Sequence, residues 1–215
     1  MVSLARSGTH VVKTALSKYI ELEIPLIQYL DLDEINFYCN SNRSNFYVTH
    51  WDYIEKWDPG KLDRFNTIIR NRNLYVVFLD RKDLTELILS RAIAYQLGWE
   101  SNKKSFKNKI RLKKSILEGE YKNTIRLKYH NNLDRIPLIV HEKIFYEDII
   151  KNGLIINNEK IPLDLGGLAE EYENSVIKNP PKNESISNYD QVLKWLDEFS
   201  KIYNENWEPY IKWGK

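Results

Sequence analysis

Hydrophobic residues in the first part of the chain follow two patterns, short continuous runs and helical spacings. Met1–Leu4 is a short apolar run, which predicts a buried strand. A polar loop follows at Ala5–His10, and Val11–Ile20 then has apolar residues three and four positions apart, as in an amphipathic helix. The chain is therefore predicted to begin with a strand, a loop and a helix.

The clearest strand is predicted at Leu74–Leu79, where β-branched and aromatic residues follow one another as in a strand buried on both faces. Helices are predicted before and after it, at Pro59–Arg70 and Leu84–Gly98, and a glycine at position 98 suits a helix stop. Strands that alternate with helices favour an α/β fold, a three-layer sandwich with a central parallel sheet flanked by helices. Further strands are predicted at Glu34–Cys39, Asn45–His50 and Glu142–Tyr146.

The second half of the chain gives weaker periodic signals. Lys104–Leu117 predicts a helix, Gly153–Leu163 a hairpin-like segment, Asn179–Ser187 a loop and Asn188–Tyr203 a closing helix. A chain of 215 residues fits one domain, so residues 1–215 are expected to form a single unit.

Composition and charge restrict the class of partner. Lys and Arg number 32 and Asp and Glu 30, and the net charge of +2 gives no general reason to expect nucleic acid or a membrane. The single cysteine, Cys39, excludes an internal disulfide, and no run approaches the roughly 18 apolar residues of a membrane span. We expect a protein that stays soluble in the cytoplasm; the sequence gives no oligomeric state.

The loop Arg6–His10 is the first candidate for binding chemistry. Between a strand and a helix, successive backbone N–H groups and the positive end of the helix dipole converge on one point, which favours an anion. Gly8 allows close approach of the backbone, Arg6 adds a positive charge, and Ser7 and Thr9 add hydroxyl donors. An ordinary turn with a helix cap is the alternative interpretation of this loop.

Three further segments offer candidate residues. His50 ends a predicted strand, and a histidine there is suited to take a proton from a hydroxyl, although a lone histidine is more often structural. Arg81 follows the strand Leu74–Leu79, where a guanidinium can contact a phosphate with two hydrogen bonds. Ser90 lies nine residues later on a predicted helix, and Tyr146 stands beside carboxylates where it can stack on a base or pack in a core.

Taken in order, these segments resemble the sulfotransferase family that uses 3′-phosphoadenosine 5′-phosphosulfate. Arg6–His10 looks like its 5′-phosphosulfate loop, and Thr49-His50 is similar to its Lys-Thr-His segment. Asp80–Trp99 (DRKDLTELILSRAIAYQLGW) looks like its 3′-phosphate segment, especially that of the bacterial trehalose-type branch, and Phe145–Asp148 matches its Phe-Tyr-Glu-Asp. The chain departs from the family at Val48, where cytosolic members have lysine, and shows no tryptophan after the first loop and no C-terminal Arg-Lys-Gly loop.

The resemblance implies a P-loop-like fold and a sulfonate transfer that needs no metal. By resemblance, His50 is the base that takes the acceptor's proton, with Asp52 or Glu55 as the alternatives, and Arg6 stabilises charge on the transferring group. The donor would be 3′-phosphoadenosine 5′-phosphosulfate, the product adenosine 3′,5′-bisphosphate (PAP), and the acceptor a small molecule or a glycan. The implied residues that bind the donor are Arg6, Ser7, Gly8, Thr9, His10, Val11, Arg81, Ser90 and Tyr146.

Two other functions fit parts of the sequence. One is a P-loop-like kinase of a nucleotide or small molecule, which the spacing disfavours because Val12 precedes Lys13-Thr14 where a Walker motif needs glycine. The other is a module that binds RNA or another polyanion through the basic run Lys103–Lys114. Apolar residues at helical spacing within that run favour the solvated face of a helix instead.

Overall fold

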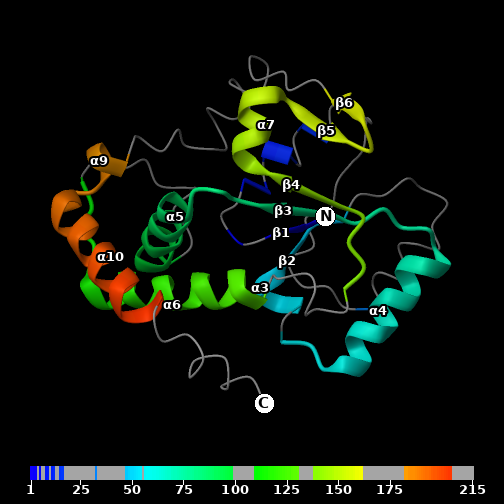
Figure 1. Cartoon of the computed structure of the whole chain (residues 1–215), viewed down its shortest axis with the longest axis horizontal. Coiled ribbons are helices and arrows are strands. Elements are labelled where there is room, and N and C mark those ends of the chain that lie inside the picture. The colour runs from blue at the N-terminus through cyan, green and yellow to red at the C-terminus, as the bar shows by residue number, and fades with distance from the viewer. Residues whose placement is uncertain are drawn as a thin grey trace. The chain divides into compact units, whose positions relative to one another are not determined.

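The computed structural model in Figure 1 describes residues 1–3, 5, 8–9, 11–12, 15–16, 32, 47–54, 56–98, 109–130, 138–161 and 182–204. The chain divides into two compact units. The first unit comprises Met1–Lys82 and His130–Asp164, and the second comprises Asp83–Tyr129 and Leu165–Lys215.

The first unit is built on a parallel sheet of four strands in the order β2-β1-β3-β4, which Figure 1 shows side by side. The predicted mixed α/β architecture with a central parallel sheet is therefore confirmed. The elements of this unit are β1 (Val2–Ser3), β2 (Thr49–His50), α3 (Trp51–Ile54), α4 (Pro59–Asn71), β3 (Val77–Asp80), β4 (Glu142–Phe145), α7 (Tyr146–Asn152), β5 (Leu154–Ile156) and β6 (Glu159–Ile161).

Helical residues cover both faces of this sheet. Phe78 and Leu79 follow each other in β3, so their side chains point to opposite faces. On one face Leu79 packs in a cluster with Val12 and with Ile149 of α7. On the other face the Phe78 ring meets Trp51 of α3 edge to face, with ring centroids 6.2 Å apart. All five of these side chains are buried, so the sheet is enclosed as the apolar run Leu74–Leu79 predicted.

Local signals fix the ends of several elements in this unit. α4 begins after Asp58, whose Oδ1 accepts a hydrogen bond of 2.8 Å from the Lys61 N–H, with proline in the first turn. β5 and β6 pair antiparallel around Asn157 and Asn158, which both have positive φ, of 52° and 63°. A two-residue turn of this kind matches the twist of a hairpin. The helix predicted at Pro59–Arg70 and the hairpin are thus confirmed.

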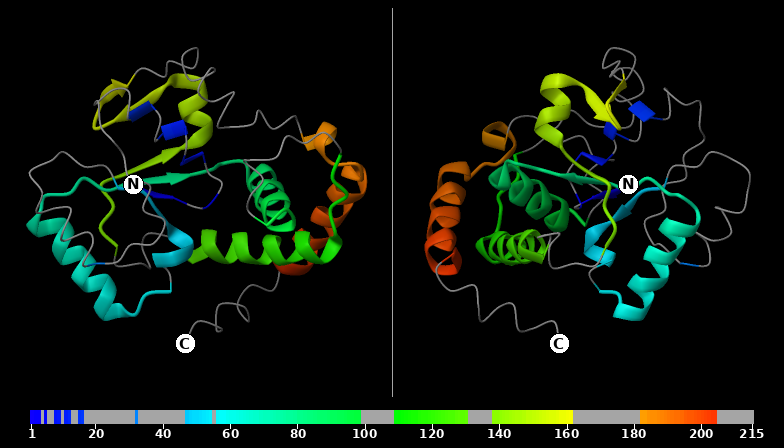
Figure 2. Two further views of the ribbon diagram at one scale, coloured as in Figure 1. Left: turned by 180° about the vertical axis from the view of Figure 1, so that it is seen from behind. Right: turned by 45° about the vertical axis from the view of Figure 1, so that its right-hand side comes forward.

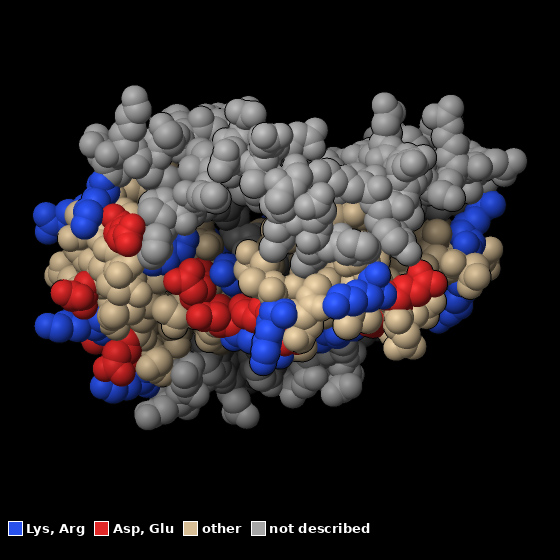
Figure 3. Space-filling model, turned by 90° about the horizontal axis from the view of Figure 1, so that it is seen from above, with Lys and Arg blue, Asp and Glu red and all other residues tan. Residues whose placement is uncertain are grey.

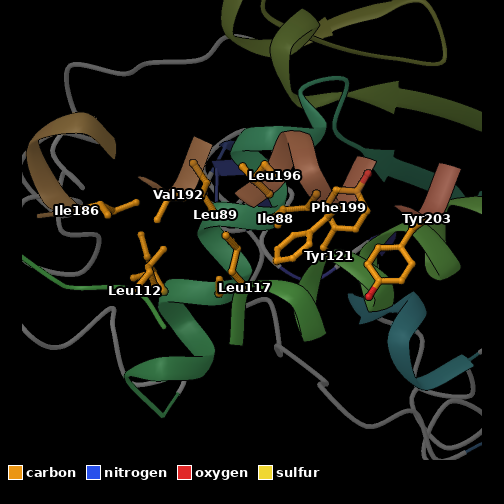
Figure 4. Packing of buried hydrophobic residues seen from close by; sticks show 12 residues of the cluster. Ile88, Leu89, Leu112, Leu117, Tyr121, Ile186, Val192, Leu196, Phe199 and Tyr203 are labelled. Atoms are coloured by element: carbon orange, nitrogen blue, oxygen red, sulfur yellow. The ribbon is translucent and has the colours of Figure 1, made fainter. Parts of the chain in front are cut away.

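The second unit is helical in the residues that the structure describes. Its elements are α5 (Leu84–Gln96), α6 (Lys114–His130), α9 (Lys182–Ser185) and α10 (Tyr189–Asn204). The three long helices lie side by side in both views of Figure 2, and their apolar faces form one core (Figure 4). Leu89 of α5, Leu117 of α6 and Phe199 of α10 are buried in that core. The helices predicted at Leu84–Gly98 and Asn188–Tyr203 are confirmed, and Gly98 has the positive φ of a helix stop, 71°.

The helix predicted at Lys104–Leu117 is wrong over residues 109–113 and confirmed over Lys114–Leu117. Residues 109–113 are not helical: Ile110 forms a parallel bridge with Ile186, and α6 begins at Lys114. The loop predicted at Asn179–Ser187 is also wrong in part, because Lys182–Ser185 forms the short helix α9. Backbone groups of each segment bond to the other, and the Ile110 N–H donates to the Ser185 carbonyl at 2.8 Å.

Other predictions hold with shifted bounds or lie outside the described residues. The strand predicted at Leu74–Leu79 begins at Val77, since the Val76 N–H donates to His141 Nδ1 at 3.0 Å instead of to a strand. Glu142–Tyr146 is a strand only to Phe145, and Tyr146 starts α7. The predicted strand Glu34–Cys39 lies outside the described residues. No helix in the described part of the chain is long and apolar enough to cross a membrane.

Candidate functional site

The carboxyl ends of the four parallel strands place four segments of the sequence at one edge of the sheet. The loop with Gly8 follows β1, His50 ends β2, Arg81 follows β3 and Tyr146 follows β4. Along the chain, β1 is followed by β2, which pairs with one side of β1. β3 then pairs with the other side of β1, and β4 lies beyond β3 (Figure 1). Strand order therefore reverses between β1 and β3, and in open parallel sheets ligands bind at the carboxyl ends of the strands at such a point.

Gly8 lies against the aromatic ring of Tyr146. Its φ is +92°, and a Cβ built on it would lie 2.6 Å from Tyr146 Cε2 and closer still to Cδ2. Real Cβ atoms essentially never come that close, so no larger residue fits here without displacing the ring. The Gly8 carbonyl accepts from the Val11 N–H at 3.0 Å, which closes the first turn of the helix that follows. Val11 is therefore engaged inside the turn, while the predicted binding residues Arg6, Ser7 and His10 lie outside the described residues.

Tyr146 also joins the loop to the arginine predicted from sequence. The Arg81 guanidinium carbon lies 5.0 Å from the centre of the Tyr146 ring, within the range of a cation–π contact. Arg81 Nε lies 3.4 Å from Oε1 of Glu147, the residue after the tyrosine, and the Arg81 side chain is only 16% exposed. The structure thus brings Gly8, Arg81 and Tyr146 together, and the Tyr146 ring contacts both the loop and the guanidinium.

The segment after β3 is held by carboxylates on both sides. Asp80 Oδ1 accepts a hydrogen bond of 2.7 Å from the Arg81 N–H, and its Oδ2 lies 3.0 Å from Lys143 Nζ on β4. The Lys82 N–H donates to Glu147 Oε2 at 2.8 Å. The Arg81 backbone is therefore fixed by contacts with its own strand and with the start of α7. Neither Asp80 nor Lys143 was a candidate from the sequence. Asp80 has a signal, since it is a charged residue at the end of an otherwise apolar strand, whereas Lys143 follows Glu142 in a strand with two charged residues.

His50 is linked to the first loop through a buried serine. Ser3 pairs with His50 in the register of β1 and β2, so both side chains lie on the same face of the sheet. Ser3 Oγ lies 3.1 Å from His50 Nδ1 and 2.8 Å from Thr9 Oγ1. The two predicted residues His50 and Thr9 therefore share one partner, which the sequence analysis missed because Ser3 stands in a buried strand.

The carboxylate considered as an alternative base has a different contact. Asp52 Oδ2 accepts a hydrogen bond of 3.2 Å from the Ala5 N–H, at the start of the loop that contains Gly8. This contact anchors the backbone of the loop to α3. The other alternative, Glu55, lies outside the described residues.

Ser90 belongs to the second unit, where it is a buried residue of α5. Its neighbour Arg91 is 2% exposed and forms a buried ion pair with Glu120 of α6, with Nε and Oε2 2.9 Å apart. A buried pair of this kind needs both partners, because removing one leaves the other charge out of water. The sequence analysis named Ser90 and missed Arg91, the charged residue beside it.

Charges of both signs are interspersed on the described residues of the face that Figure 3 shows. Within the basic run, Lys109, Arg111 and Lys113 are exposed, whereas Lys114 lies 2.7 Å from Glu198 in an ion pair. This arrangement does not favour a polyanion-binding surface over an ordinary solvated one.

No protein-family model, no curated protein and no solved structure matches this chain.

Proposed function

We propose that this chain is a sulfotransferase that moves a sulfonate group from 3′-phosphoadenosine 5′-phosphosulfate to a hydroxyl or amine acceptor. One observation carries the proposal. The segments that resemble the family's loop, base and phosphate motifs lie at the carboxyl ends of four neighbouring strands of one parallel sheet. The Tyr146 ring contacts Gly8 and Arg81, and Ser3 contacts both Thr9 and His50.

The chemistry of this edge suits an anionic group. Gly8 precedes a helix whose first turn closes on its carbonyl, so the backbone N–H groups at the start of the helix and the helix dipole favour a negative charge there. Arg81 adds a positive charge beside the same loop, held by Glu147 and the Tyr146 ring. The proposed donor carries phosphate and sulfonate groups, which such a loop can bind without a metal.

In the proposed reaction, His50 takes the proton from the acceptor's hydroxyl or amine while the oxygen or nitrogen of that group attacks sulfur. The new bond to sulfur forms as the bond from sulfur to the phosphate oxygen breaks, and the electron pair leaves with the bisphosphate. Arg6 and the N–H groups of the loop would stabilise charge on the transferring and leaving groups. Arg81 and Ser90 are proposed to bind the 3′-phosphate by the family resemblance alone, and Tyr146 to border the nucleoside; the P-loop-like fold and a cytoplasmic location belong to the same proposal.

The test of donor choice is a comparison of nucleotides. Adenosine 3′,5′-bisphosphate should raise the melting temperature more than AMP or ATP, because only the bisphosphate carries a 3′-phosphate. A ligand that binds only the folded chain stabilises it by about 2.7 kcal/mol at a hundredfold excess over its dissociation constant. Equal shifts with AMP and the bisphosphate would contradict the proposal, and magnesium-dependent turnover of ATP would favour a kinase instead.

Two substitutions separate binding from chemistry. Arg81→Ala should weaken bisphosphate binding about 10- to 100-fold, since a charge-assisted contact is worth roughly 1.5–3 kcal/mol. Arg70→Ala, in an exposed position of α4, is the matched control and should leave binding unchanged. His50→Ala should keep binding and lower turnover by about 10²–10⁴.

Asp52→Asn distinguishes the alternative base from a loop anchor. The amide oxygen of asparagine can still accept the Ala5 N–H, so a loop anchor tolerates this change. If Asp52 is the base, Asp52→Asn should lower turnover as much as His50→Ala is expected to lower it. Turnover, bisphosphate affinity by calorimetry and melting temperature on the same variants decide between the two residues.

A further inference from the structure

Three polar side chains, of which two are buried, are linked from the first loop to His50. Ser3 Oγ stands in the middle, 2.8 Å from Thr9 Oγ1 and 3.1 Å from His50 Nδ1. Ser3 is 0% exposed and Thr9 5% exposed, so water does not compete for the contact between their hydroxyls, whereas the contact of Ser3 with His50 is partly buried. Ser3 Oγ also lies 3.5 Å from the Thr49 carbonyl oxygen, at the limit of a hydrogen bond.

The number of hydrogens limits the hydrogen bond between Ser3 and a neutral His50 to two arrangements. A serine hydroxyl has one hydrogen, and a neutral histidine has one N–H, on Nδ1 or on Nε2. If Ser3 donates to His50 Nδ1, the imidazole hydrogen must be on Nε2. If Ser3 donates instead to Thr9 or to the Thr49 carbonyl, His50 can donate through Nδ1–H to Ser3, and Nε2 carries the lone pair.

The second arrangement fits the surroundings and the proposed chemistry better. The Thr49 carbonyl can only accept a hydrogen bond, so it draws the Ser3 hydrogen away from His50. Donation from Ser3 to Thr9 also leaves the Thr9 hydroxyl hydrogen available to an anion held at the loop. A base must have its lone pair on the nitrogen that meets the acceptor, and the hydrogen bond of the other ring nitrogen sets which nitrogen that is.

We propose that Ser3 is a positioning residue that holds His50 as the Nδ1–H tautomer, with the lone pair on Nε2. The role of His50 as a base rests on the proposed function, whereas the tautomer is a property of the folded chain without any ligand. Ser3 acts through the ring of His50, and through Thr9 it ties the position of that ring to the anion-binding loop.

The tautomer can be read directly by NMR on the intact chain. The sequence has four histidines, so ring ¹⁵N–¹H spectra of histidine-labelled protein are simple, and His50→Gln identifies the His50 signals. At a pH where the ring is neutral, we expect a protonated Nδ1 and an unprotonated Nε2. An Nε2–H tautomer in the wild-type chain would overturn the proposal, and this measurement needs no variant that might fail to fold.

Substitutions of Ser3 test the cause. Ser3→Ala should convert His50 to a mixture of tautomers and lower turnover about 10- to 100-fold, with bisphosphate affinity unchanged. Ser3→Thr keeps the hydroxyl and should retain the wild-type tautomer and rate; Ser3→Cys keeps the size of the side chain with a weaker hydrogen bond and should fall between. A Ser3→Ala chain with the wild-type tautomer would show that Ser3 only fills the core.

The two proposals fail separately. A chain that does not bind the bisphosphate or transfer sulfonate, yet shows the Nδ1–H tautomer and loses it in Ser3→Ala, retains the positioning role and loses the proposed reaction. A chain that transfers sulfonate with His50 in the Nε2–H tautomer retains the reaction and loses the positioning role.

Discussion

Gly8→Ala is the substitution whose cost the structure specifies most closely. Gly8 has a φ of +92°, and an added Cβ would meet the Tyr146 ring 2.6 Å from Cε2. Gly153 provides a matched control in the same unit, because its φ is +89° and a Cβ there would meet only Lys160 Cε, at 3.3 Å. That atom is near the end of a flexible side chain and can move aside. The two glycines therefore share the backbone strain and differ in the clash.

The expected costs follow from these two contributions. A non-glycine residue at a φ near +90° costs about 1–3 kcal/mol, so Gly8→Ala and Gly153→Ala should both lower the free energy of unfolding by this amount. Overpacking against a fixed ring adds typically about 1–3 kcal/mol, and only Gly8→Ala incurs it. Gly8→Ala should thus destabilise the first unit by about 2–6 kcal/mol in total.

Urea unfolding, followed by circular dichroism and tryptophan fluorescence, measures both costs. In a Tyr146→Ala background the ring is gone, so Gly8→Ala should cost no more than Gly153→Ala, and the double-mutant cycle returns the clash as a coupling energy. Equal costs for Gly8→Ala and Gly153→Ala in the wild-type background would refute the packing of Tyr146 on the loop.

Two further predictions concern the second unit. Glu120→Ala should lower the free energy of unfolding of this unit by about 3–5 kcal/mol, because it removes the carboxylate that pairs with the buried Arg91. Asp197→Ala removes one partner of an exposed ion pair with Lys201, and should cost less than about 1 kcal/mol in the same urea titration. The hydrogen bond from the Tyr203 hydroxyl holds the pKa of Glu118 below its ordinary value of 4.5, so this carboxylate contributes stability above pH 4.5 that is lost as the pH falls through the lowered pKa. Tyr203→Phe should make the melting temperature fall less between pH 7 and pH 3; an unchanged pH profile would contradict the role of this hydrogen bond.

Local signals predicted the helices α4 and α5. α4 combines Asp58 as a cap, proline in the first turn and apolar residues at helical spacing, and α5 begins after Asp83, whose Oδ1 accepts from the Glu86 N–H at 2.9 Å. Each of these signals lies within a few residues of the helix that it starts. A reading of the sequence alone can use them because cap and helix are neighbours in the chain.

The segment before α6 shows why such a reading fails elsewhere. Residues 109–113 have apolar residues that fit a helix, yet their backbone groups bond to distant partners. The Leu112 N–H donates to Asn188 Oδ1 at 3.0 Å, and the Lys113 N–H donates to Gln96 Oε1 at 3.1 Å. These partners satisfy the N–H groups of an extended backbone, and the residues of the segment itself do not predict them.

The sequence predicted residues at the carboxyl ends of the strands as site residues, but not the residue that links two of them. His50, Arg81 and Tyr146 follow strands, where a polar or aromatic residue after an apolar run is visible in the sequence. Ser3 was missed because a small polar residue inside a short strand has the same appearance whether it fills space or orients a neighbour. Only the register that pairs Ser3 with His50 separates these two roles.

Parallel topology by itself explains why four segments share one edge, since all carboxyl ends of a parallel sheet lie there whatever the protein does. It does not require side chains of those segments to contact one another. Here the Tyr146 ring contacts Gly8 and Arg81, and Ser3 of β1 contacts both Thr9 and His50. In the proposed reaction, proton transfer at His50 is therefore expected to respond to changes in Ser3, whereas changes in Tyr146 should act at the loop and at Arg81.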